Sequence, residues 1–134
     1  MQIEFRIKTK RSQEIVNITA QVEAIVKKSK VKEGICLVYV PHATCAVIIN
    51  ENYDPSVCED IISALNKIIP EHAGYKHDAI DNNAHAHIKS ALLGPSKSVP
   101  IADGKLQLGR WQGIALAEFD GPRDRNIIVK ILKN

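Results

Sequence analysis

The stretch GICLVYVPHATCAVII, residues 34–49, decides the fold because it holds two apolar runs separated by a short polar break. Apolar residues fill nearly every position of 35–40 and again of 45–49. Continuous runs of this length are typical of strands that are covered on both faces. Pro41 cannot donate a ladder hydrogen bond, so the first strand is predicted to end before it. His42 is therefore expected on a rigid scaffold between two buried strands, where a base or ligand can be positioned.

Further strand patterns lie toward both ends of the chain. Residues 3–7 alternate apolar and charged side chains, which predicts a half-buried strand, and residues 14–17 predict a short second strand. Residues 111–119 and 126–132 predict two more strands. Asp103-Gly104, placed between apolar runs, is a strong hairpin signal.

Three segments have helical spacing. Apolar residues recur at helical intervals over residues 18–26. A second helix is predicted from Pro55, with Asp54 as its N-cap and Pro70 as its end. A third is predicted over residues 84–93, where Gly94-Pro95 supplies the stop.

These elements predict one α+β domain over residues 1–134, with about seven or eight strands in mainly antiparallel sheets and about three helices. Neighbouring strands are expected to be joined as hairpins. No internal linker or repeat interrupts the chain. Strands that are apolar on both faces also predict burial against further copies of the chain, with sites near subunit boundaries.

Composition narrows the classes of function. The formal net charge of +3 and the absence of long basic runs argue against nucleic-acid binding. The longest apolar runs are too short to cross a bilayer, and the first ten residues lack the apolar block of a signal peptide. Three cysteines without close pairing fit free thiols in a reducing compartment, which predicts a cytoplasmic protein.

The segment NNAHAHI, residues 82–88, carries the chemistry that most needs an explanation. His85 and His87 lie there, and His77 lies eight residues before His85. Imidazole is the commonest metal ligand and titrates near neutral pH, so a metal or acid–base site is predicted. Residues two apart on a helix point about 200° away from each other. Either the helix begins after His85, or only one of the pair is at the site; solvated surface histidines are the alternative.

Six separated motifs closely resemble the YjbQ-like family, also called UPF0047 or secondary thiamine-phosphate synthase. The match runs in order from about residue 2 to residue 132. The motifs are HATC at 42–45, INENYDP at 49–55, YxHD at 75–78, HIKSxLxGPS at 87–96, LGxWQG at 108–113 and EFDGPR at 118–123.

The resemblance implies a compact α+β fold, a homotrimer and a weak thiamine-phosphate synthase activity, which joins hydroxymethylpyrimidine diphosphate to thiazole phosphate. The family often has Asp at the position of His85 and Thr at the position of Arg110. Imidazole at the first position favours zinc over magnesium. The positions that match the family's characteristic polar residues are His42, Thr44, Asn50, Glu51, His77, His87, Lys89, Trp111, Gln112 and Glu118.

Roles for these side chains follow from the reaction, in which a diphosphate leaves and its charge must be neutralised. His77, His85 and His87 are predicted to hold a divalent metal ion, with His42, Glu51 and Glu118 as catalytic groups. Binding of a small phosphorylated substrate is assigned to Thr44, Asn50, Lys89, Arg110, Trp111, Gln112 and Arg123.

Two other functions fit the same residues. Three histidines and a carboxylate could hold zinc with an open position for water, as in a zinc-dependent hydrolase of a small substrate. Alternatively, the chain forms a non-catalytic trimer that binds a metal or ligand. The chain lacks an Asp-rich magnesium motif and a glycine-rich phosphate cradle. If it is a synthase, we therefore expect it to form thiamine phosphate slowly.

Overall fold

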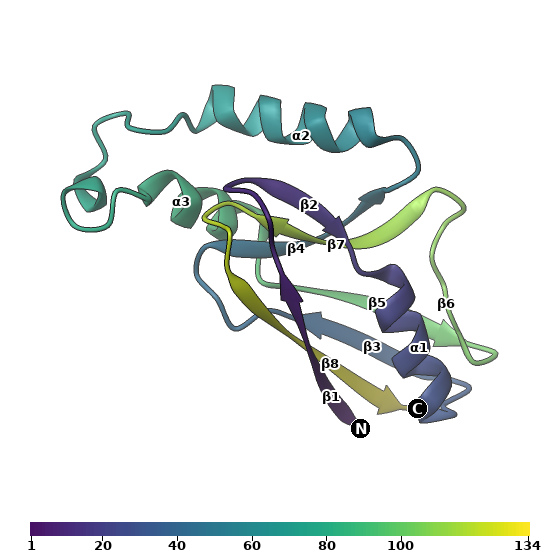
Figure 1. Ribbon diagram of the computed structural model, residues 1–134. Helices are drawn as coiled ribbons and strands as arrows, with labels where there is room; N and C mark the ends of the chain where they lie inside the picture. Colours follow the sequence, from purple (N-terminus) through teal and green to yellow (C-terminus); the bar gives the residue numbers. More distant parts are fainter.

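Two antiparallel sheets form the framework of the computed structural model, which describes residues 1–134 (Figure 1). The helices are α1 (Thr19–Ser29), α2 (Pro55–Ile68) and α3 (Ala84–Leu93), with a 3₁₀ turn η1 (Lys76–Ala79). The strands are β1 (Gln2–Lys8), β2 (Glu14–Asn17), β3 (Gly34–Tyr39), β4 (Cys45–Glu51), β5 (Ser96–Ala102), β6 (Lys105–Leu106), β7 (Gln112–Glu118) and β8 (Asp124–Lys133).

The five-stranded sheet has the order β1-β8-β3-β5-β6 and the three-stranded sheet the order β2-β7-β4. All strand pairs are antiparallel. The predicted α+β class with mainly antiparallel sheets is therefore confirmed. Figure 1 shows α1 beside the five-stranded sheet, whereas α2 and α3 lie on the side of the three-stranded sheet.

The expectation that neighbouring strands are joined as hairpins is wrong for most of the chain. Only β5 and β6 pair across a tight turn, where Asp103 and Gly104 both have positive φ, as a type I′ turn requires. β3 and β4 belong to different sheets. After β3, the N–H of Val40 donates to the carbonyl of Pro95, and the polar break then takes the chain to the other sheet.

The main core lies between the two sheets and α1. Its centre is aliphatic, as the sequence predicts, and Val38, Leu116 and Ile127 are fully buried in it. A fully buried side chain of this size contributes roughly 1.5–3 kcal/mol relative to an exposed one. A smaller cluster under α2 and α3 contains Leu65 and Phe119.

Burial on both faces holds for β4 but not for β3. In β4, Val47 packs in the main core and Ala46 in the smaller cluster. In β3, Ile35 is 48% exposed and Tyr39 is 38% exposed, because no helix covers the outer face of the five-stranded sheet. None of the helices is long and apolar enough to span a membrane.

Candidate functional site

His42 lies in the polar break between β3 and β4 and is half-buried. Its Nε2 accepts a hydrogen bond from the N–H of Asn126, 2.9 Å away. A neutral imidazole that accepts at Nε2 carries its proton on Nδ1. Burial, and then the charge of Arg125, lower the pKa of His42. The ring is thus held neutral at pH 7, with an Nδ1–H donor.

His77 and His87 come together from η1 and α3. Their ring centroids are 4.8 Å apart and the rings meet edge to face. The buried Nε2 of His77 has no hydrogen-bond partner; it lies 3.5 Å from a carboxylate oxygen of Asp81 without forming a hydrogen bond. This nitrogen is therefore unsatisfied, with almost no surface open to solvent.

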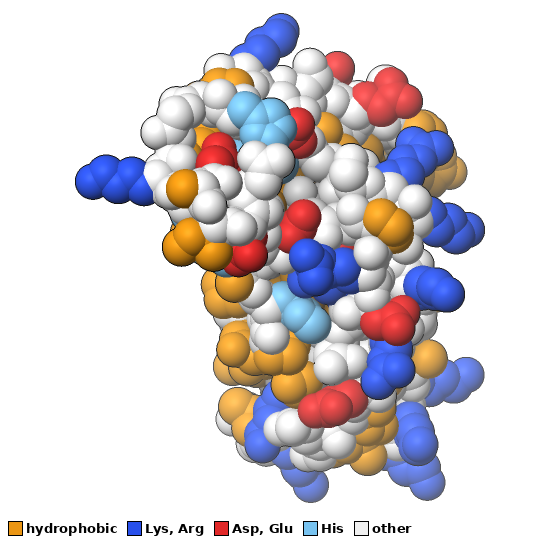
Figure 2. Space-filling model, turned by 60° about the vertical axis from the view of Figure 1, so that its left-hand side comes forward, with side chains coloured by type: hydrophobic (Ala, Val, Ile, Leu, Met, Phe, Trp, Pro, Cys, Tyr) orange, Lys and Arg blue, Asp and Glu red, His pale blue; other side chains and the backbone are white.

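His87 borders two surface hollows of about 380 Å³ each. One is also lined by Tyr75 and His77, and the other by His42, Cys45 and Ser90. We call His42, His77, His87 and these two hollows the imidazole face. Figure 2 shows two patches of histidine on one side of the molecule, with acidic and basic side chains between them.

His85 points elsewhere. Its Nδ1 is 2.7 Å from the Nζ of Lys89 and its Nε2 is 3.3 Å from a carboxylate oxygen of Glu71. Burial, and then the charge of Lys89, lower the pKa of His85. The helix begins at Ala84, before both histidines, so their side chains diverge.

The predicted metal ligands His77, His85 and His87 are therefore split between two places. No group of three His, Cys, Asp or Glu side chains in the structure is arranged to hold a metal ion. Two imidazoles are one fewer than the three protein ligands that catalytic zinc sites have. The three-histidine set does not fit a metal ion within one chain.

Lys89 is fully buried rather than presented to a substrate. Its Nζ donates to the side-chain oxygen of Asn66 on α2 and contacts His85. The Nζ also lies 5.9 Å from the centre of the Phe119 ring. Burial lowers the pKa of Lys89. These contacts tie α2 to α3 and leave the predicted phosphate-binding ammonium away from the described pockets.

Glu118, predicted as catalytic, forms a buried ion pair with Arg125. The predicted substrate ligand Thr44 belongs to the same network, because its hydroxyl accepts from Arg125 at 2.7 Å. Thr9 donates to Glu118 at 2.9 Å. The network holds β7, β8 and the β3–β4 break together behind His42. Arg125 was not among the predicted site residues. It lies two residues before Ile127 on the same strand, so the alternating pattern places its side chain on the buried face.

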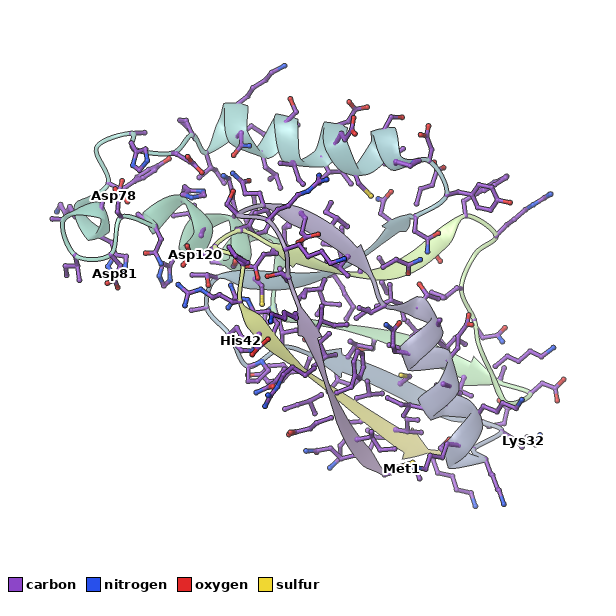
Figure 3. All side chains as sticks on the ribbon, in the orientation of Figure 1. Met1, Lys32, His42, Asp78, Asp81 and Asp120 are labelled. Carbon is purple, nitrogen blue, oxygen red and sulfur yellow. The ribbon has the colours of Figure 1, made fainter.

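Arg123 is exposed and stands closer to the imidazole face. Its guanidinium donates to the carboxylate of Asp120 at 2.8 Å, and Asp120 also accepts from the amide of Asn83 at 2.8 Å. The charge of Arg123 contributes to the lowered pKa of His42. Figure 3 shows Asp120 beside α3, with His42 below it.

Asn50 and Glu51 lie in a groove between α2 and the three-stranded sheet, away from these histidines. Trp111 is half-exposed, and its ring meets that of Tyr53 edge to face with centroids 5.2 Å apart. The guanidinium of Arg110 lies 5.2 Å from the centre of the Trp111 ring. The side chain of Gln112 accepts from the N–H of Gly109 at 2.8 Å. The predicted site residues thus divide between the imidazole face, the groove, this exposed corner and the buried network.

Cys45 lines the hollow beside His42, but it is not a reactive thiol. Burial raises its pKa to about 12. A thiol with such a pKa is protonated at neutral pH and is a poor nucleophile. The side chains on or beside this face that could contact a polar substrate are therefore the imidazoles, Ser90 and Arg123.

Relatives of this chain share both its sequence and its fold. The family described as UPF0047 protein YjbQ-like matches residues 3–134. A UPF0047 protein of Archaeoglobus fulgidus is 48% identical over 130 residues, covering 97% of this chain and 100% of that protein. The UPF0047 protein YugU of Bacillus subtilis is 40% identical over 128 residues, covering 95% of this chain and 96% of that protein.

Solved structures agree over the whole length. A YjbQ-like protein of unknown function from Sulfolobus solfataricus superposes with a TM-score of 0.97 at 42% identity, covering 100% of this chain and 97% of that one. A member of the YjbQ/UPF0047 family from Clostridium acetobutylicum gives a TM-score of 0.94 at 46% identity, covering 97% and 99%. The chain belongs to the YjbQ-like family of UPF0047 proteins.

Proposed function

We propose that this protein is an enzyme that acts on a small phosphorylated molecule at the imidazole face, and that thiamine-phosphate formation is a reaction it performs at a low rate. One observation carries the proposal: His87 borders both hollows, so that His42 and His77, from separate elements, share one surface with it. Neutral imidazoles supply N–H donors and acid–base groups without a large desolvation cost.

In the proposed reaction the thiazole nitrogen attacks the methylene carbon of the pyrimidine. The new C–N bond forms as the C–O bond to diphosphate breaks, and the diphosphate leaves with the bonding electrons. The Nδ1–H of His42 and the guanidinium of Arg123 are suited to phosphate oxygens that gain charge. Without a glycine-rich cradle to enclose the diphosphate, stabilisation is modest and the expected turnover is slow.

We still propose a divalent metal ion, but with two of the three predicted histidine ligands. His77 and His87 are adjacent and the buried Nε2 of His77 has no hydrogen-bond partner, so we place zinc at this pair if the His77 ring can turn toward it and further ligands come from substrate or a second copy. Imidazole ligands favour zinc over magnesium. The reaction steps above use no metal.

We further propose that the chain assembles as a homotrimer through the outer face of the five-stranded sheet. Ile35 and Leu132 are paired neighbours there, 48% and 52% exposed, and Tyr39 pairs with Ile128 four residues further along β3. Exposed apolar neighbours of this kind mark an interaction surface. Light scattering should give three chains for the wild type and a smaller assembly for Ile35→Glu.

The decisive assay measures thiamine phosphate formed from the two phosphorylated precursors. We expect His87→Gln and His42→Gln each to reduce kcat/KM by about a hundredfold or more, the lower end of what a general acid–base group contributes. Both rings are near the surface, so thermal unfolding should change little. The matched control is His72→Asn, because His72 is exposed, lines neither hollow and has a positive φ that Asn tolerates.

The proposal is wrong if the wild-type protein forms no product above a buffer blank. It is also wrong if His87→Gln retains full activity, or if His72→Asn lowers activity as much as His87→Gln does. Activity that survives in His87→Gln would move the reaction away from the imidazole face.

A further inference from the structure

A groove of about 400 Å³ separates α2 from the three-stranded sheet. Its floor is apolar and includes Ile15 of β2, Ile48 of β4 and Ile62 of α2. Leu65 near the far end of α2 is the only fully buried residue of that helix. Figure 3 shows side chains from α2 and from the strands reaching into the space between them. A groove of this size suits a small organic ligand.

The walls of the groove are acidic. Glu14, Glu51 and Glu59 line it against a single cation, Arg11, which gives the lining a formal charge of −2 in a chain whose net charge is +3. None of these carboxylates forms an ion pair in the structure. Glu14 is fixed as an acceptor by the N–H groups of Lys10 and Arg11 at 2.6 and 2.9 Å.

Two further observations point to a cationic ligand with N–H donors. Gln13 lines the groove, and its Oε1 is buried and has no donor in the structure. An acceptor buried in this way carries a desolvation cost of about 1–3 kcal/mol until a donor meets it. Burial raises the pKa of the Cys58 thiol, and the charges of Asp54, Glu51 and Glu59 raise it further, as expected where the potential is negative.

The spacing of the carboxylates excludes one compact inorganic cation. They come from β2, β4 and α2, and no three His, Cys, Asp or Glu side chains are close enough to hold a metal ion. An anion is disfavoured by the charge. An elongated molecule with cationic groups and an apolar body satisfies separate carboxylates and covers the floor.

We propose that this groove binds an aliphatic amine or diamine, with its methylene chain on Ile48 and Ile62 and its ammonium groups at Glu51 and Glu59. No lining residue of the groove lines either hollow of the imidazole face. The groove is thus a second site, independent of the phosphorylated substrate proposed above.

The test uses 1,5-diaminopentane as probe and 1,5-pentanediol as its neutral counterpart, with isothermal calorimetry and amide chemical shifts of the full-length protein at low salt. We expect saturable binding of the diamine, no binding of the diol, and shifts confined to α2, β2 and β4. Glu51→Gln and Glu59→Gln should each weaken binding by up to about fivefold, the range of an ion pair near the surface.

The matched control is Glu4→Gln, which makes the same charge change at an exposed position of β1 outside the groove. Because Glu51 and Glu59 accept no side-chain hydrogen bond in the structure, their Gln variants should unfold at the wild-type temperature. Ile62→Trp fills the floor and should abolish binding while thiamine-phosphate formation is unaffected.

Three results would overturn the proposal. The first two are equal binding of the diol and equal weakening of diamine binding by Glu4→Gln and Glu59→Gln. The third is displacement of the diamine by Mg²⁺ under conditions in which Na⁺ at the same ionic strength displaces none. Absence of diamine binding to the wild type would also overturn it. Each outcome is read from binding alone, so it is distinguishable from failure of the synthase assay.

Discussion

His85 and His87 lie on opposite sides of α3 although only one residue separates them: His85 contacts Lys89 and Glu71, whereas the ring of His87 meets that of His77. The first histidine is buried and structural, because it satisfies an ammonium group inside the protein. The second borders both surface hollows. Two residues, about 200° around the helix, thus separate a buried histidine from one at the surface.

Zinc binding should follow this division. We expect His77→Ala and His87→Ala to reduce the zinc that the purified protein takes up, since each removes half of the adjacent pair. His85→Gln should retain it, because His85 faces Glu71 instead. Elemental analysis after exposure to one equivalent of zinc measures the difference. Equal zinc content in all variants would place the ion elsewhere.

The pH dependence of stability should report His85, which is buried, and His42, which is half-buried. The pKa values of His85 and His42 are lowered in the folded chain, so as pH falls below about 6.5 the unfolded chain binds more protons than the folded one. Their contribution is therefore fully present above that pH and is lost as pH falls below it. Glu71, Asp78 and Asp120 face His85 and oppose the lowering without reversing it.

Urea unfolding between pH 7.5 and pH 5 tests this sign. We expect wild-type stability to fall toward pH 5, and His85→Gln to flatten that dependence. His72→Asn, which alters an exposed histidine, should keep the wild-type slope. A slope of the opposite sign would show that the folded chain holds His85 protonated.

The Glu118–Arg125 pair should behave as a buried ion pair. Arg125→Met leaves the carboxylate of Glu118 buried and unpaired, so we expect a loss of about 3–5 kcal/mol in the free energy of unfolding. The double variant Glu118→Leu/Arg125→Met removes both charges and should recover most of that loss. Urea unfolding of the single and double variants measures the coupling; strict additivity of the two single losses would contradict it.

Thiol reactivity should be confined to one cysteine. Burial raises the pKa of Cys36 to about 11 and that of Cys45 to about 12. The pKa of Cys58 is raised as well, but Cys58 is the one thiol that is partly exposed. We expect one thiol per native chain to react with Ellman's reagent near pH 8, and all three to react in denaturant. Cys58→Ser should abolish the native reaction; rapid labelling of Cys45 would contradict its assignment as a core residue.

Apolar pattern and turn chemistry in the sequence determined the elements. The run at residues 34–49 predicted two strands and a break, Asp54-Pro55 predicted the start of α2, and Asp103-Gly104 predicted the one tight hairpin. Each of these signals is local, because a backbone angle, a cap or a period depends on neighbouring residues alone. The family motifs likewise identified the fold before any coordinates.

Only the tertiary structure decided which strands pair and which polar side chains meet. β3 and β4 are neighbours in the chain but enter different sheets, and the ionic partner of Glu118 is seven residues away on another strand. The sequence predicts that Lys89 binds substrate, yet the packing of α2 on α3 buries its side chain. Burial and pairing depend on contacts between distant segments. Only the fold therefore decided which polar residues lie at the imidazole face, in the groove or in the core.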